Sequence, residues 1–197
     1  RQMCIRDRDM VESAKHAKLP FMTAQTLRYE PAIQTLQELG PSLGNWQYLS
    51  LTMRFETRSG QTGNREGWDR YGVLMEFGIH LLDLVRFLTG DEVVSVSTDM
   101  KSPTSQDPEC RVWGTLTTSQ GLPCFLDVSR VSQGRITRAE IIGKQGQACA
   151  DWTNHEVTLL REGGVVTNYH CPKFPTLLPL LRDFFSALQT DGHTPIT

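Results

Sequence analysis

The pattern of apolar and polar residues changes its period several times along the 197-residue chain. Apolar residues at helical spacing between Pro31 and Gly40 predict a short helix with a proline near its first turn and a glycine stop. From Trp46 to Phe55, apolar and polar residues alternate, which predicts a half-buried strand. Residues 72–91 return to helical spacing and predict one long amphipathic helix.

Short alternating segments follow this long helix. They lie around residues 94–100, 112–117, 124–128, 136–142 and 157–160, and another follows Gly163–Gly164. Short strands in series after one long helix predict an α+β fold, with a mostly antiparallel open sheet covered on one face by helices. Residues 177–188 return to helical spacing and predict a last helix that packs on another element.

The N-terminal region differs from this scheme. Residues 11–20 look like the last turns of a helix that runs into a short buried strand at residues 21–24. Residues 1–8 follow neither period, and we expect them to be a non-native leader. The chain stops at "HTPIT" without a terminating element. These features predict a fragment truncated at both ends.

Composition excludes several classes of protein. Apolar residues make up 39% and charged residues 21% of the chain, as in globular proteins, and the formal net charge of -2 gives no basic field for nucleic acid. No apolar run approaches the ~20 residues of a membrane-spanning helix, so we expect neither nucleic acid nor membrane as a partner. The five cysteines are scattered without a C-x-x-C pair, which predicts reduced thiols and a cytoplasmic location.

The long helix carries an unusual polar stripe. Glu76 and His80 are four residues apart and Asp83 follows three later, so the spacing places them on one face. Gly78 costs about 1 kcal/mol relative to alanine inside a helix and indicates close approach of a ligand or backbone. The stripe is either a solvated face, with Glu76–His80 and Asp83–Arg86 pairs, or the lining of a site. The E-x-x-x-H spacing offers only two ligands, so no metal site is predicted.

Three segments together resemble one family. "GVLMEFGIHLLDLVRFLTGD" (residues 72–91) is similar to the helix motif L-x-D-x-G-x-H-x-x-D of the glucose-fructose oxidoreductase/inositol dehydrogenase/rhizopine catabolism (Gfo/Idh/MocA) family, with Glu76 where aspartate is usual. "FMTAQTLRYEPAIQTLQELGPSLGNW" resembles its strand, R-[FY]-x-P turn and helix. "AEIIGKQGQACADW" resembles its I-x-G-x-x-G strand pair. In this order they cover nearly the whole chain after about residue 11.

The resemblance implies an oxidoreductase of two domains. Members have an N-terminal Rossmann domain, followed by a substrate domain, and act on sugars, inositols or related polyols with NAD or NADP. Residues 9–45 would be the last helix and strand of the Rossmann domain, and residues 46–197 the substrate and oligomerisation domain. A homo-oligomer through the open sheet face is implied, and Trp113, Phe125 and Asp127 alternate as a partly covered outer face would require.

The resemblance also assigns roles to the helix residues. His80 would be the general acid/base that takes the hydroxyl proton as hydride leaves the same carbon, a task that suits an imidazole with an ordinary pKa of about 6.5. Glu76 would bind a substrate hydroxyl or orient the imidazole. Asp83 lies further along the helix, and we expect a structural role for it.

Four further residues are candidates for substrate binding by the same resemblance. Trp68 and Arg70 precede the helix in a loop that would border the substrate, and the alternative is a loop anchor and a surface charge. Arg28 and Tyr29 lie at the domain junction. They would face the nicotinamide or the substrate, or else form a hinge held by packing.

Two motifs of the family are not found in this sequence. It contains no G-x-G-x-x-G after a strand and no Glu-Lys-Pro segment whose lysine would work beside the histidine. We therefore expect NAD or NADP to be held mainly by a missing N-terminal part, and this polypeptide alone to be inactive. The alternatives are a non-catalytic dinucleotide or ligand sensor and a sheet-mediated oligomerisation module. His80 discriminates, because a sensor needs no base there.

Overall fold

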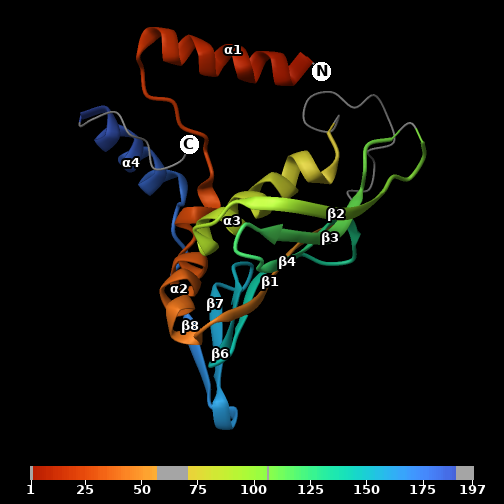
Figure 1. Ribbon diagram of the computed structural model, residues 1–197, viewed down its shortest axis with the longest axis vertical. Helices are drawn as coiled ribbons and strands as arrows, with labels where there is room; N and C mark the ends of the chain where they lie inside the picture. Colours follow the sequence, from red (N-terminus) through yellow and green to blue (C-terminus); the bar gives the residue numbers. More distant parts are fainter. Residues whose placement is uncertain (1, 57–70, 106, 190–197) are drawn as a thin grey trace. The chain divides into compact units, whose positions relative to one another are not determined.

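The computed structural model of the protein describes residues 2–56, 71–105 and 107–189, with side chains from residue 8 onward (Figure 1). They form two compact units. One contains the residues up to Tyr29 together with those from Phe174, and the other runs from Glu30 to Lys173. The predicted domain limits at residues 8 and 45 stay predictions.

The larger unit is built on one twisted sheet of eight strands, in the order β2-β3-β4-β1-β5-β6-β7-β8 (Figure 1). β1 pairs with β4 in parallel, and the six other neighbouring pairs are antiparallel. The mostly antiparallel open sheet and the α+β class are therefore confirmed. The strands are β1 Trp46–Glu56, β2 Val93–Lys101, β3 Arg111–Thr118, β4 Pro123–Ser132, β5 Ile136–Gly143, β6 Gly146–Asp151, β7 Glu156–Arg161 and β8 Val166–His170.

One face of this sheet is apolar and buried across the strands β4, β1, β5, β6 and β7. Leu51 pairs with Leu126 on one side and Ala139 on the other, and the row continues through Ala150 to Val157. All five side chains are at most 3% exposed. Helix α2 (Pro31–Leu39) packs against β6 and β7, and helix α3 (Ile79–Thr89) packs against β1. The prediction that helices cover one face is confirmed.

Helix α2 begins and ends for local reasons. Pro31 occupies its first turn, where a missing backbone N–H has no cost. Gly40 keeps a right-handed conformation and continues into a 3-10 turn, Gly40–Leu43. The chain leaves that turn at Gly44, whose φ of 72° favours glycine. The glycine that ends this helical segment is therefore Gly44.

The smaller unit contains helix α1 (Gln2–Ala17), the 3-10 turn η1 (Thr26–Tyr29) and helix α4 (Leu177–Gln189), which packs against η1. The predicted strand at residues 21–24 is wrong, because this segment is not a strand and Phe21 is 37% exposed. A strand needs a neighbour for its hydrogen bonds, and none of the described strands pairs with it. The predicted last helix is confirmed as α4.

Four cysteines with described side chains are free thiols. Burial raises the pKa of Cys124 and of Cys149 to about 11. Both thiols are therefore protonated at neutral pH and poorly nucleophilic. In the described part of the chain, no helix is long and apolar enough to cross a membrane.

Candidate active site

The polar helix begins with an irregular turn. Residues Leu74–Gly78 (η4) form a π-turn, and α3 continues from Ile79 to Thr89, where Gly90 ends it at φ 65°. The expected single helix is thus interrupted at the residues that carry its motif. A Cβ added at Gly78 would lie 2.7 Å from Leu74 Cδ1, so this glycine accommodates a side chain of its own helix.

The segment Glu109–Cys110, just before β3, fixes the start of this helix. The Glu109 carbonyl accepts the Val73 N–H at 3.0 Å, and the Glu109 carboxylate accepts the Leu74 N–H at 3.1 Å. An anionic acceptor is favourable there, because the first N–H groups of a helix have no intrahelical partner. The Cys110 carbonyl accepts the Arg130 N–H at 2.9 Å. One short segment therefore ties the helix start to the end of β4.

Removing this cap should weaken the larger unit. We expect Glu109→Ala to lower the free energy of unfolding by about 1 kcal/mol, the usual value of a helix cap. Denaturant unfolding followed by circular dichroism measures the change. Glu38→Ala, at an exposed position of α2, is the matched control and should be neutral. Equal losses in the two variants would contradict a capping role for Glu109.

Glu76 is paired with an arginine of the sheet. Its carboxylate contacts the Arg130 guanidinium, and the two side chains are only 21% and 17% exposed. The Arg130 Cζ lies 5.6 Å from the centre of the Phe77 ring, and that ring stacks on Phe55 at 4.1 Å and 21°. Pairing with Glu76 and stacking on Phe77 hold the Arg130 guanidinium in place. The Glu76 carboxylate is therefore oriented, and its negative charge is balanced by Arg130.

His80 is half-buried, one turn after Glu76. Burial lowers the pKa of the imidazole below its ordinary 6.5, and the charge of Asp83 opposes this change. Burial dominates because it removes water from the charged form. His80 is therefore neutral at pH 7 and able to accept a proton.

The predicted common polar face is only partly correct. Asp83 is 8% exposed and lies among buried residues of α3, so its predicted structural role fits its burial, whereas its placement on a solvated face is wrong. A π-turn contains an additional residue, which shifts Glu76 out of line with the positions after it. Arg86 pairs with Glu92 at 2.7 Å. A purely solvated stripe would pair Glu76 with His80, and Asp83 with Arg86. The described ion pairs instead join Glu76 to Arg130 and Arg86 to Glu92.

Comparison with known proteins identifies the family of this chain. Residues 41–149 match the GFO/IDH/MocA C-terminal domain, over more than half of the chain. The chain belongs to the GFO/IDH/MocA family. A D-apiose dehydrogenase of Paraburkholderia graminis is 33% identical over 88 residues, which are 43% of this chain and 23% of that protein.

Solved structures show the same fold. UDP-N-acetylglucosamine 3-dehydrogenase from Acidithiobacillus ferrooxidans aligns with a TM-score of 0.77 and 23% identity, over 96% of this chain and 58% of that one. The 3-ketoreductase KijD10 of Actinomadura kijaniata, solved with NADP and TDP-benzene, aligns with a TM-score of 0.79 and 15% identity, over 95% and 60%. This GFO/IDH/MocA chain therefore spans little more than half the length of these structures.

Four further site residues were predicted outside the polar helix. Trp68 and Arg70 fall outside the described residues. Arg28 and Tyr29 belong to η1 in the smaller unit. There the Tyr29 hydroxyl donates to the Asp183 carboxylate at 2.8 Å, and burial, followed by this bond, raises the pKa of Tyr29. Tyr29 therefore anchors α4, and a role of Arg28 or Tyr29 toward substrate stays a prediction.

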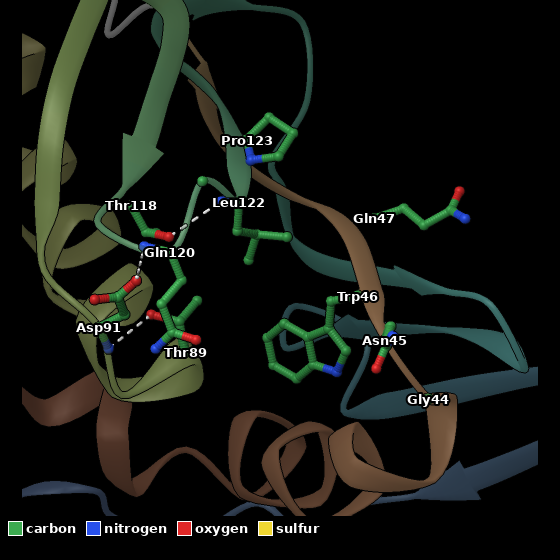
Figure 2. Close-up of a pocket in the computed structure, with 11 residues that line it drawn as sticks. Gly44, Asn45, Trp46, Gln47, Thr89, Asp91, Thr118, Gln120, Leu122 and Pro123 are labelled. Atoms are coloured by element: carbon green, nitrogen blue, oxygen red, sulfur yellow. Dashed lines mark hydrogen bonds between the residues drawn. The ribbon is translucent and has the colours of Figure 1, made fainter.

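A pocket of about 420 Å³ lies at the other end of α3 (Figure 2). It joins Trp46, at the start of β1, to Thr89, roughly 13 Å along the helix axis from His80. Hydrogen bonds from Ser119 and from the Gln120 N–H lower the pKa of Asp91 to about 2. These hydrogen bonds hold the β3–β4 turn against the end of α3. Because of its distance along the helix, this pocket is separate from the His80 site.

The described residues include no cluster of three or more His, Cys, Asp or Glu that could hold a metal ion. The sequence also contains no G-x-G-x-x-G motif, the turn that cradles the diphosphate of a nicotinamide dinucleotide. The described residues thus provide a proton acceptor, and the motif for binding a diphosphate is missing from the sequence. Arg130, Phe55 and Glu109, which complete the site, are distant in sequence, and no local motif marked them.

Proposed function

We propose that this chain is the substrate domain of an NAD(P)-dependent oxidoreductase that transfers hydride between a nicotinamide and a sugar, inositol or related polyol. The observation that carries the proposal is the half-buried His80, with its lowered pKa, one helical turn after the paired Glu76. The D-apiose dehydrogenases among the relatives favour a sugar as substrate. The choice between NAD and NADP would depend on residues outside this chain.

The residues of this chain would handle the proton. A nicotinamide, when bound, supplies the hydride acceptor. The neutral His80 imidazole takes the proton of the substrate hydroxyl, as its lowered pKa permits at neutral pH. Glu76, held by Arg130, would accept a hydrogen bond from a neighbouring hydroxyl and so orient the reacting carbon.

The same site favours an enzyme over a sensor. A binding site that only reads a polyol needs hydrogen-bonding groups, and Glu76 with Arg130 would suffice for that. A half-buried histidine with a lowered pKa adds a group suited to proton transfer. This chain alone would be inactive, because it contains no dinucleotide-binding turn.

A second proposal concerns the uncovered sheet face. Phe125 is 44% exposed there and meets Tyr48 edge-on at 5.4 Å, while Trp113 lies between Lys101 and Arg111. Partly exposed aromatic side chains flanked by charged side chains are typical of an interface. We propose a homo-oligomer through this face. Light scattering should show a dimer that Phe125→Glu converts to a monomer, and an unchanged mass would contradict it.

The proposed activity has a direct test. The protein encoded by the complete reading frame is assayed with NAD and with NADP against D-apiose, D-glucose and myo-inositol, by the absorbance of the reduced nicotinamide. We expect reduction of one nicotinamide by at least one polyol. If the protein binds a polyol and a nicotinamide but produces no reduced cofactor, the sensor alternative holds instead.

A further inference from the structure

A line of stacked side chains leads away from the helix start. Arg130, paired with Glu76, lies over Phe77, and Phe77 stacks on Phe55 at the end of β1. The other face of this aromatic pair is met by a second guanidinium, since the Arg135 Cζ lies 4.9 Å from the Phe55 ring centre. Two arginines thus bracket two stacked rings beside the candidate active site.

The two arginines differ in their charge balance. The charge of Arg130 is neutralised by Glu76, with both groups largely buried. Arg135 is exposed, and within the described ranges no carboxylate forms an ion pair with it. Among the described residues, Arg135 therefore contributes a positive charge without a paired carboxylate at this end of the sheet. Stacking on Phe55 limits the freedom of that guanidinium, which lowers the entropy cost of binding an anion.

The topology of the sheet explains why Arg135 is there. β1 lies between β4 and β5, and Glu56 pairs with Ser132 while Arg54 pairs with Ile136. The connection from β4 to β5 must therefore pass over the carboxyl end of β1. Arg135 is the last residue of this connection, directly before β5. Through its contact with Phe55 it lies next to the ring that stacks on Phe77, the residue three positions before His80.

We propose that Arg135 is a specificity-determining residue that binds an anionic group, a carboxylate or a phosphate, on the polyol whose hydroxyl proton His80 accepts. This inference rests on the proposed function. The substrate class is then a sugar acid or a phosphorylated sugar. A guanidinium suits either group, because its fork of N–H donors matches both.

A stacked surface arginine is not by itself evidence of a site, and the chain offers a comparison. Arg111 lies 4.7 Å over the Trp113 ring, is likewise exposed, and projects from the uncovered face of the sheet. Like Arg135 it is an exposed arginine stacked on an aromatic ring, but no acid–base group of the candidate site lies on its face of the sheet. Arg111→Gln is therefore the matched control for Arg135→Gln.

The test is a titration of this 197-residue chain, followed by nitrogen-proton NMR of the Arg135 side chain and the His80 imidazole. The probes are D-glucose, D-gluconate, D-glucose 6-phosphate and inorganic phosphate. We expect at least one anionic sugar to shift both residues and to bind about tenfold tighter than D-glucose. If D-gluconate binds more tightly than D-glucose 6-phosphate, the recognised group is the carboxylate. The opposite order identifies the phosphate. Arg135→Gln should abolish this preference, whereas Arg111→Gln should keep it.

Several results would overturn the inference. Equal affinity for D-glucose and both anionic sugars would do so, as would equal losses in the two arginine variants, or inorganic phosphate binding as tightly as the preferred anionic sugar. In each of these cases a shift of His80 by D-glucose still supports the proposed function. If none of the three sugars shifts His80, the proposed function fails and the inference fails with it.

Discussion

Replacing His80 by glutamine should lower the turnover of the complete protein by about 100- to 10,000-fold, the range for loss of a general acid/base. Glutamine retains hydrogen-bonding capacity but cannot take up the proton that leaves the substrate hydroxyl. Because the loss concerns the chemical step, kcat should fall while KM changes little. Steady-state rates with the preferred polyol and nicotinamide measure both constants.

His170→Gln is the matched control for this variant. His170 is exposed at the end of the edge strand β8. Its replacement should leave kcat and KM unchanged. If His80→Gln and His170→Gln both retain the rate of the unmodified protein, His80 is not the acid/base of this site.

A large effect on stability is expected at Gly143, the last residue of β5. A Cβ added there would overlap the Leu43 carbonyl oxygen, which accepts the Gln145 N–H at 2.9 Å. A backbone atom cannot move aside by changing a rotamer, so the 3-10 turn at Gly40–Leu43 would have to shift. We expect Gly143→Ala to lower the free energy of unfolding by about 3 kcal/mol, at the upper end of the overpacking range. Urea denaturation of this chain measures the loss.

Gly134→Ala provides the comparison, because a Cβ there meets nothing within 4 Å and the backbone is not left-handed. This variant should be neutral or slightly stabilising, since alanine restricts the unfolded chain. A loss at Gly134 as large as that at Gly143 would show that the effect comes from glycine replacement in general.

Much of the fold was predictable from local patterns. The alternation from Trp46 to Phe55 corresponds to β1, and its apolar positions Leu49, Leu51 and Met53 are buried. Pro31 correctly marks the start of α2. These features depend on the period of apolar and polar side chains and on the backbone geometry of single residues. Both can be read from short stretches of sequence.

The arrangement of the site was not predictable in this way. That β1 pairs with β4 in parallel depends on the crossover through α3, and the pairing of Glu76 with Arg130 follows from it. The π-turn at Leu74–Gly78 shifts the helix phase by a residue, which a helical period does not reveal. The buried position of Asp83 was missed for the same reason.

The dependence of kcat/KM for polyol oxidation on pH tests the central claim most directly. The reaction needs neutral His80, and burial lowers its pKa below 6.5 against the opposing charge of Asp83. The rate should therefore rise with pH through a single pKa below 6.5 and stay level above it, and His80→Gln should remove this step. A step at the same pH in the His80→Gln protein would assign the proton transfer to another group and contradict the account.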